Sequence, residues 1–126
     1  MIGLCLQDNS KLCFVEAKQS SPQTVNEERF NEFIGEITDK FTHSFELWMS
    51  IVSKRRKAEI SPKIGSPKIE GLKFKFILVI KGHKEEWLVP ITRAMRKAMM
   101  PYIKIWESDV IVLNEDGAKK WHLIQV

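Results

Sequence analysis

The chain has 126 residues, of which 44% are hydrophobic and 29% are charged, and this predicts one domain spanning residues 1–126. It has no run of about eighteen apolar residues, so we expect no transmembrane helix. The first residues lack the pattern of a secretory signal, and Cys5 and Cys13 are too few for a disulfide scaffold. These features together predict a reduced, cytoplasmic protein.

The net charge of +4 is concentrated in one segment of the chain. Residues 54–75 contain eight basic and two acidic side chains, whereas the rest of the chain contains twelve basic and fourteen acidic ones. A local basic segment suits a polyanionic partner better than a uniformly basic surface does. DNA or RNA is therefore the expected class of partner.

The chain begins with a predicted β-hairpin followed by a long helix. Residues 2–7 and 11–18 are apolar runs separated by a short polar turn, which is typical of a hairpin. Thr24 precedes Glu27 by three residues, the spacing of a capping box, so the helix is expected to begin there. Its apolar residues recur at steps of three and four, as in a helix packed on a sheet: Phe30, Phe33, Ile34, Ile37, Phe41, Phe45, Trp48 and Val52.

The middle of the chain is predicted to hold a basic flexible loop and a buried strand. Residues 53–72 contain two prolines and two glycines without periodicity, and so predict the loop. Residues 73–82 alternate at first and then run apolar from Phe76 to Ile80, which is typical of a central strand buried on both faces.

A second helix and a last strand are expected in the remainder. Residues 83–102 predict the helix, in which Pro90 either kinks the chain or marks a fresh start, and Pro101 ends the helix. Residues 109–114 predict another buried strand, and residues 118–121 predict one helical turn before a short terminal run. The inner face of the second helix is expected to be Trp87, Ile91, Ala94, Met95 and Ala98.

This order of elements predicts an α/β fold: a mixed β-sheet with an N-terminal hairpin and two main helices packed on it. Within the hairpin, Glu16 and Lys18 fall on one face of the second strand, because strand side chains alternate with a period of two. A carboxylate at such a place can hold Mg²⁺, and a lysine beside it can orient a water molecule or neutralise a phosphate. The alternative is a solvated strand end.

The stretch LCFVEAKQSSP resembles the third-strand motif of the PD-(D/E)xK nuclease superfamily, which has the restriction-endonuclease-like fold. The resemblance covers residues 2–82 and includes their order of strand, strand, helix and strand. It implies that Glu16 is a metal ligand and catalytic residue, that Lys18 is the catalytic lysine, and that the cofactor is Mg²⁺. The superfamily core usually starts with a helix and a strand before this hairpin. Either the C-terminal elements or a second chain supply an equivalent, or the protein is a shortened member.

The resemblance also implies an aspartate opposite Glu16 on the preceding strand. A two-residue turn after Asp8 would place Gly3 opposite Glu16 and leave Asp8 about 16 Å away, since a strand rises about 3.3 Å per residue. We therefore expect an incomplete metal site and weak or lost cleavage. Glu28 or Glu32 of the following helix is a candidate source of the missing carboxylate; the alternative is that both belong to a solvent-facing acidic stripe.

Other residues add candidates for nucleic-acid binding. Lys54, Arg55, Arg56 and Lys57 follow the long helix, and Arg93, Arg96 and Lys97 lie on the second helix, so both groups are candidate phosphate contacts. The alternative for the first group is a solvated helix end. The histidines His43, His83 and His122 lack metal-ligand spacing.

Two hypotheses follow for the function. The first is nucleic-acid binding by a nuclease-like protein with weak or lost Mg²⁺-dependent phosphodiesterase activity. The second is a non-enzymatic interaction module that dimerises through an exposed sheet edge or a hydrophobic face. A homodimer is expected in either case.

Overall fold

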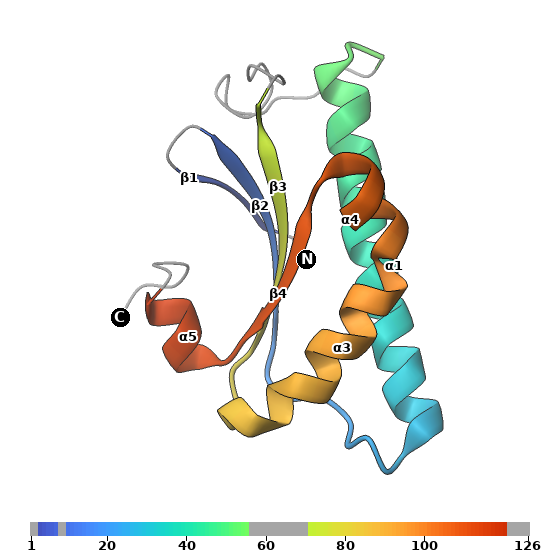
Figure 1. The fold of residues 1–126 in the computed structure, drawn as a ribbon, viewed down its shortest axis with the longest axis vertical. Coiled ribbons are helices and arrows are strands. Elements are labelled where there is room, and N and C mark those ends of the chain that lie inside the picture. Colours follow the sequence, from blue (N-terminus) through green and yellow to red (C-terminus); the bar gives the residue numbers. More distant parts are fainter. Residues whose placement is uncertain (1–2, 8–9, 56–70, 121–126) are drawn as a thin grey trace.

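The computed structural model describes residues 3–7, 10–55 and 71–120. It is an α/β structure, as the sequence predicts, and Figure 1 shows its elements in chain order. They are β1 (Gly3–Gln7), β2 (Lys11–Lys18), α1 (Glu27–Val52), β3 (Lys73–Ile80), the 3-10 helix η1 (Glu85–Trp87), α3 (Leu88–Ala98), α4 (Met100–Trp106), β4 (Asp109–Leu113) and α5 (Glu115–Lys120).

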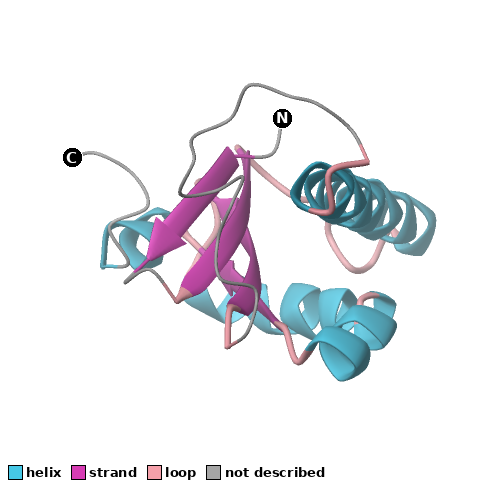
Figure 2. Ribbon diagram, turned by 90° about the horizontal axis from the view of Figure 1, so that it is seen from above, coloured by secondary structure: helices cyan, strands magenta, loops and turns pink. Residues whose placement is uncertain are grey.

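The strands form one mixed sheet in the order β1-β2-β3-β4. β1 pairs with β2 in the antiparallel direction, whereas β2 with β3 and β3 with β4 are parallel. Both parallel connections pass through helices, and α1, α3 and α4 lie on one face of the sheet while α5 lies on the other (Figures 1 and 2). Parallel strands that advance in one direction with the same crossover hand bring their helices to one face.

The main core lies between the sheet and α1, α3 and α4. Strand alternation divides the side chains, so that Phe14 and Phe76 face the helices while Cys13 and Ile77 contribute to a smaller apolar cluster with Ala118. The predicted stripe of α1 is buried from Phe30 to Trp48, as its periodicity indicates, and Val52 at its end is partly buried.

The start of α1 differs from the prediction. The helix begins at Glu27, and Asn26 is its N-cap, with the side-chain oxygen accepting a hydrogen bond from the Arg29 N–H at 3.4 Å. The capping box predicted from Thr24 is therefore wrong, because Glu27 occupies the first position of the helix and not the third. An Asn N-cap satisfies the same exposed backbone donors.

The predicted second helix consists of three pieces. After η1, α3 has Pro90 in its first turn, where a missing backbone N–H is tolerated, so the fresh start is the correct alternative. α3 ends at Ala98, and Pro101 lies in the first turn of α4, a helix that the sequence analysis did not predict. The same tolerance explains why a proline that closes one helix also begins the next.

The predicted inner face of this region is correct only in part. Ile91 and Met95 are buried, but Trp87 is 41% exposed and Ala98 is exposed. The 3-10 turn explains the error at Trp87, because the α-helical phase begins only at Leu88. Helical spacing counted back from Ile91 therefore does not hold for that residue.

The remaining predictions on strands are largely confirmed. Residues 76–80 of β3 are all buried. β4 lies at one edge of the described sheet. Only Val110 and Val112 are buried and the residues between and beside them are half-buried, so β4 is less buried than predicted. The last helix is longer than the predicted turn, and residues 121–126 lie outside the described part. Among the described helices, none combines the length and apolarity needed to cross a bilayer.

Candidate functional site

The hairpin register differs by one residue from the predicted register. Gly3 pairs with Val15 and Gln7 pairs with Lys11, because three residues separate the two strands instead of two. The prediction that Gly3 lies opposite Glu16 is therefore wrong, since Gly3 lies opposite Val15. Asp8 lies outside the described residues. The described residues of β1, GLCLQ, contain no carboxylate.

Glu16 lies on the helix-facing side of β2, between Phe14 and Lys18 on the same face. Its side chain is only 3% exposed, and its Oε1 lies 3.5 Å from Nζ of Lys40 on α1. The neighbouring residue across the ladder on β3 is Leu78, which is fully buried. A buried carboxylate is costly without a compensating cation, and Lys40 supplies that cation here.

The alternative carboxylates on α1 are not brought to Glu16. Glu28 and Glu32 are both exposed. A helix rises about 1.5 Å per residue, so they lie about 18 and 12 Å along the axis from Lys40, which does reach Glu16. Lys18 is half-buried at the end of β2, on the face predicted for it.

Among the described residues, the ion-pair partner of Glu16 does not fit the Mg²⁺ implied by the superfamily resemblance. Mg²⁺ prefers carboxylate and other oxygen ligands, whereas the group beside the Glu16 carboxylate is an ammonium. Across residues 3–7, 10–55 and 71–120, no three His, Cys, Asp or Glu side chains come together in a way that would hold a metal. No hydrolytic step through a metal is therefore derived from this arrangement.

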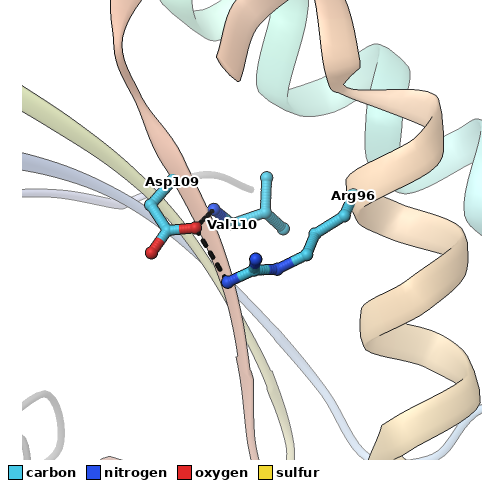
Figure 3. A network of polar contacts seen from close by, with 3 residues as sticks. All are labelled: Arg96, Asp109 and Val110. Atoms are coloured by element: carbon cyan, nitrogen blue, oxygen red, sulfur yellow. Dashed lines mark hydrogen bonds and ion pairs between the residues drawn. The ribbon is translucent and has the colours of Figure 1, made fainter. Parts of the chain in front are cut away.

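The basic residues of α3 lie on the surface. Arg93, Arg96 and Lys97 are all exposed. The Nη2 of Arg96 donates to Oδ1 of Asp109 at 2.9 Å, and the same oxygen accepts from the Val110 N–H at 2.8 Å (Figure 3). Arg96 is thereby held against the start of β4, although its side chain remains 50% exposed.

A groove of about 570 Å³ lies between α3, the end of β4 and α5. Its charged lining consists of Arg93, Arg96 and Lys120 together with the carboxylates Glu85 and Asp116. It therefore lies beside the carboxyl end of a parallel strand, where open α/β sheets commonly bind ligands. Lys120 is a cation of this groove that the sequence analysis missed, since no local pattern links it to α3.

The described residues of the first basic cluster, Lys54 and Arg55, do not line the α3 groove. Lys54 and Arg55 are exposed just beyond the end of α1, where Lys54 has a left-handed backbone with φ 62°. Figure 1 places this end of α1 at one end of the molecule and most of α3 toward the other. Arg56 and Lys57 lie outside the described residues. Lys18 and Lys97 do not line the α3 groove.

The histidines and cysteines do not combine into a described site. His43 is exposed, and the His83 ring packs edge-to-face on Trp87 with centroids 5.4 Å apart. Cys13 is buried in the smaller apolar cluster, as a small core residue would be. His122 lies outside the described residues, and so does the side chain of Cys5.

Comparisons with protein-family models, with curated proteins and with solved structures gave no match to this chain.

Proposed function

We propose that the chain is a PD-(D/E)xK-like protein that binds nucleic acid through α3, with weak or lost Mg²⁺-dependent phosphodiesterase activity. The observation that carries the proposal is the charge of α3: three exposed cations, no carboxylate within the helix, and an open groove along one side. Neutralising phosphates with such cations is the main source of sequence-independent affinity for nucleic acid.

Arg96 supports this proposal through its geometry. A guanidinium can donate two parallel hydrogen bonds to a phosphate, and Arg96 uses Nη2 on Asp109 while half of its side chain remains exposed. Its conformation is already restricted by that bond, so less side-chain entropy is lost on binding. Asp109 also offsets part of the charge of Arg96. Arg93 and Lys97 are therefore expected to account for most of the salt dependence of nucleic-acid binding.

The acidic residues of the groove define where the phosphates would lie. Glu85 and Asp116 line the same groove as the cations. They would repel a phosphate that entered deeply, so the polyanion is expected to follow the exposed side of α3 and not to fill the groove. The ion pair of Glu16 with Lys40 supports the second part of the proposal, because it supplies an ammonium where hydrolysis would need a metal.

The binding test is fluorescence anisotropy with labelled single- and double-stranded oligonucleotides over a range of salt concentrations. We expect the double variant Arg93→Gln/Lys97→Gln to reduce the magnitude of the slope of log affinity against log salt by about 1.8 for double-stranded DNA and about 1.4 for single strands, since each phosphate contact contributes about 0.9 and about 0.7 respectively. Lys104→Gln is the matched control, because Lys104 is exposed on α4 and does not line the groove. Absence of binding at low salt, or an unchanged slope in the double variant, would contradict the proposal.

Cleavage is tested separately with Mg²⁺ or Mn²⁺ on the wild type and on Lys18→Ala. We expect little or no cutting by either protein. Robust metal-dependent cutting by the wild type that disappears in Lys18→Ala would show that the motif is catalytically active, and would overturn this part of the proposal.

A further inference from the structure

A second groove, of about 430 Å³, lies between the C-terminal half of α1 and α4. Its lining is mainly apolar and includes Phe45, Met49, Ile105 and Trp106. Ile105 is 74% exposed and Trp106 is 38% exposed. A large apolar side chain exposed beside an apolar groove is a typical feature of an interaction surface.

The groove is built from well-packed residues. The Phe45 ring lies 5.0 Å from the Trp106 ring and 5.8 Å from the Tyr102 ring, measured between centroids. The Tyr102 hydroxyl donates to Oε1 of Glu46 at 3.0 Å, which joins α4 to α1 a second time. Packed residues therefore hold the groove, while Ile105, which also lines it, is largely exposed and lies outside the core.

The charges of this groove are balanced. Its charged lining residues, within the described part of the chain, are one carboxylate, Glu46, and one guanidinium, Arg55. A rim of a single sign would repel a second copy of the same surface. A rim with one charge of each sign is complementary to itself when the two-fold axis passes midway between the two residues, because each then meets the partner's opposite charge.

We propose that the α1/α4 groove is the interface of a homodimer. In this arrangement Ile105 of each protomer enters the groove of its partner, and Glu46 faces Arg55 of the partner subunit in two equivalent ion pairs. The protruding apolar residue, the groove and both charges lie on the same patch, which is what an isologous interface requires. The nucleic-acid proposal uses α3, β4 and α5, so the two surfaces are tested independently.

The first test measures the molar mass of the full chain by light scattering and sedimentation over a range of concentrations. We expect a dimer for the wild type and a monomer for Ile105→Asp, which should fold normally because Ile105 is 74% exposed. Val25→Asp is the matched control, since Val25 is 93% exposed and outside the groove, and it should remain dimeric. A monomeric wild type at every concentration, or a dimeric Ile105→Asp, would overturn the proposal.

The second test uses the predicted ion pairs. Glu46→Arg and Arg55→Glu should each raise the dissociation constant about a hundredfold, because each creates two like-charge contacts of about tenfold effect. An equimolar mixture of the two variants should associate again, since one then carries two cations and the other two carboxylates at these positions. Circular dichroism checks that each variant is folded.

The exposed β1 edge is the competing dimer surface. Leu4 on β1 is 37% exposed, so Leu4→Lys adds a charge at that edge without disturbing the main core. We expect Leu4→Lys to remain dimeric. Dissociation by Leu4→Lys, or failure of the mixed charge variants to associate, would contradict an α1/α4 interface.

Discussion

Removing either member of the Glu16–Lys40 pair tests whether Glu16 is a structural ion-pair residue. The Oε1–Nζ distance of 3.5 Å corresponds to about 1.2 kcal/mol in bulk water and about 4.7 kcal/mol at an effective dielectric constant of about 20. Glu16 is nearly inaccessible but Lys40 is 39% exposed, so solvent screens the pair in part. We expect a coupling energy of about 2 kcal/mol, between these limits.

The assay is a double-mutant cycle with Glu16→Gln, Lys40→Met and the double variant. The free energy of unfolding of each is measured in urea by circular dichroism and tryptophan fluorescence. Additivity of independent sites holds to about 0.5 kcal/mol, so a coupling energy below that value would refute the ion pair as described.

The same proteins also distinguish the lysine from a metal as the compensating cation. A Mg²⁺ site on Glu16 would add about 2.7 kcal/mol to the unfolding free energy at a hundred times its dissociation constant. We expect Mg²⁺ to leave the unfolding free energy of wild type and Glu16→Gln equally unchanged. Stabilisation of the wild type alone would show that Glu16 binds the metal.

Two further predictions concern single residues. Gly82→Ala should lower the unfolding free energy by about 1–3 kcal/mol, because the new Cβ would lie 2.6 Å from the Gln19 carbonyl oxygen. Gly35→Ala should raise the unfolding free energy by about 0.5–1 kcal/mol, because Gly35 lies in mid-helix and the new Cβ would have nothing within 4 Å. Equal effects in urea unfolding would contradict this contrast. Burial raises the pKa of the Tyr102 phenol above its usual value, and the hydrogen bond and charge of Glu46 raise it further. The folded state therefore favours the neutral phenol. The contribution of Tyr102 to the unfolding free energy is lost as the pH rises above about 10. Tyr102 is the single tyrosine, so an absorbance titration reads it directly; Glu46→Gln should lower its pKa, and an unchanged pKa would contradict the contact.

The elements that sequence predicts best here are those whose periodicity reports burial directly. The stripe from Phe30 to Trp48 and the run from Phe76 to Ile80 are buried as expected, because spacing of about 3.6 residues or a continuous apolar run leaves few other arrangements. Boundaries are predicted less well. Asn26 and Thr24 are both good N-caps, and only the packing of the helix decides between them.

The hairpin register illustrates a limit of turn chemistry. Asp, Asn and Ser favour a two-residue and a three-residue turn alike, so the residues alone leave the turn length open. One extra residue moves Gly3 from the position opposite Glu16 to the position opposite Val15, although both strands are correctly predicted. Details of a site are therefore less predictable than the strands that carry it.

Lys40 was missed for a different reason. It lies twenty-four positions after Glu16, and the two meet only because the crossover through α1 returns over β2. The available signal was a cation placed at the edge of the apolar stripe, directly before Phe41 and three residues after Ile37. A polar residue at such a position faces the sheet obliquely, which makes it a candidate partner for a charge on the covered face.

A buried carboxylate needs positive charge beside it, and either a metal ion or a lysine can provide that charge. The Glu-x-Lys pattern on a strand is therefore compatible with both a hydrolytic centre and a core ion pair. In this structure the next helix brings Lys40 to Glu16, and the double-mutant cycle together with the Mg²⁺ measurement distinguishes the two. Arg93 and Lys97 on α3 are exposed, so under the proposed function their substitution should change binding of a polyanion without changing the core.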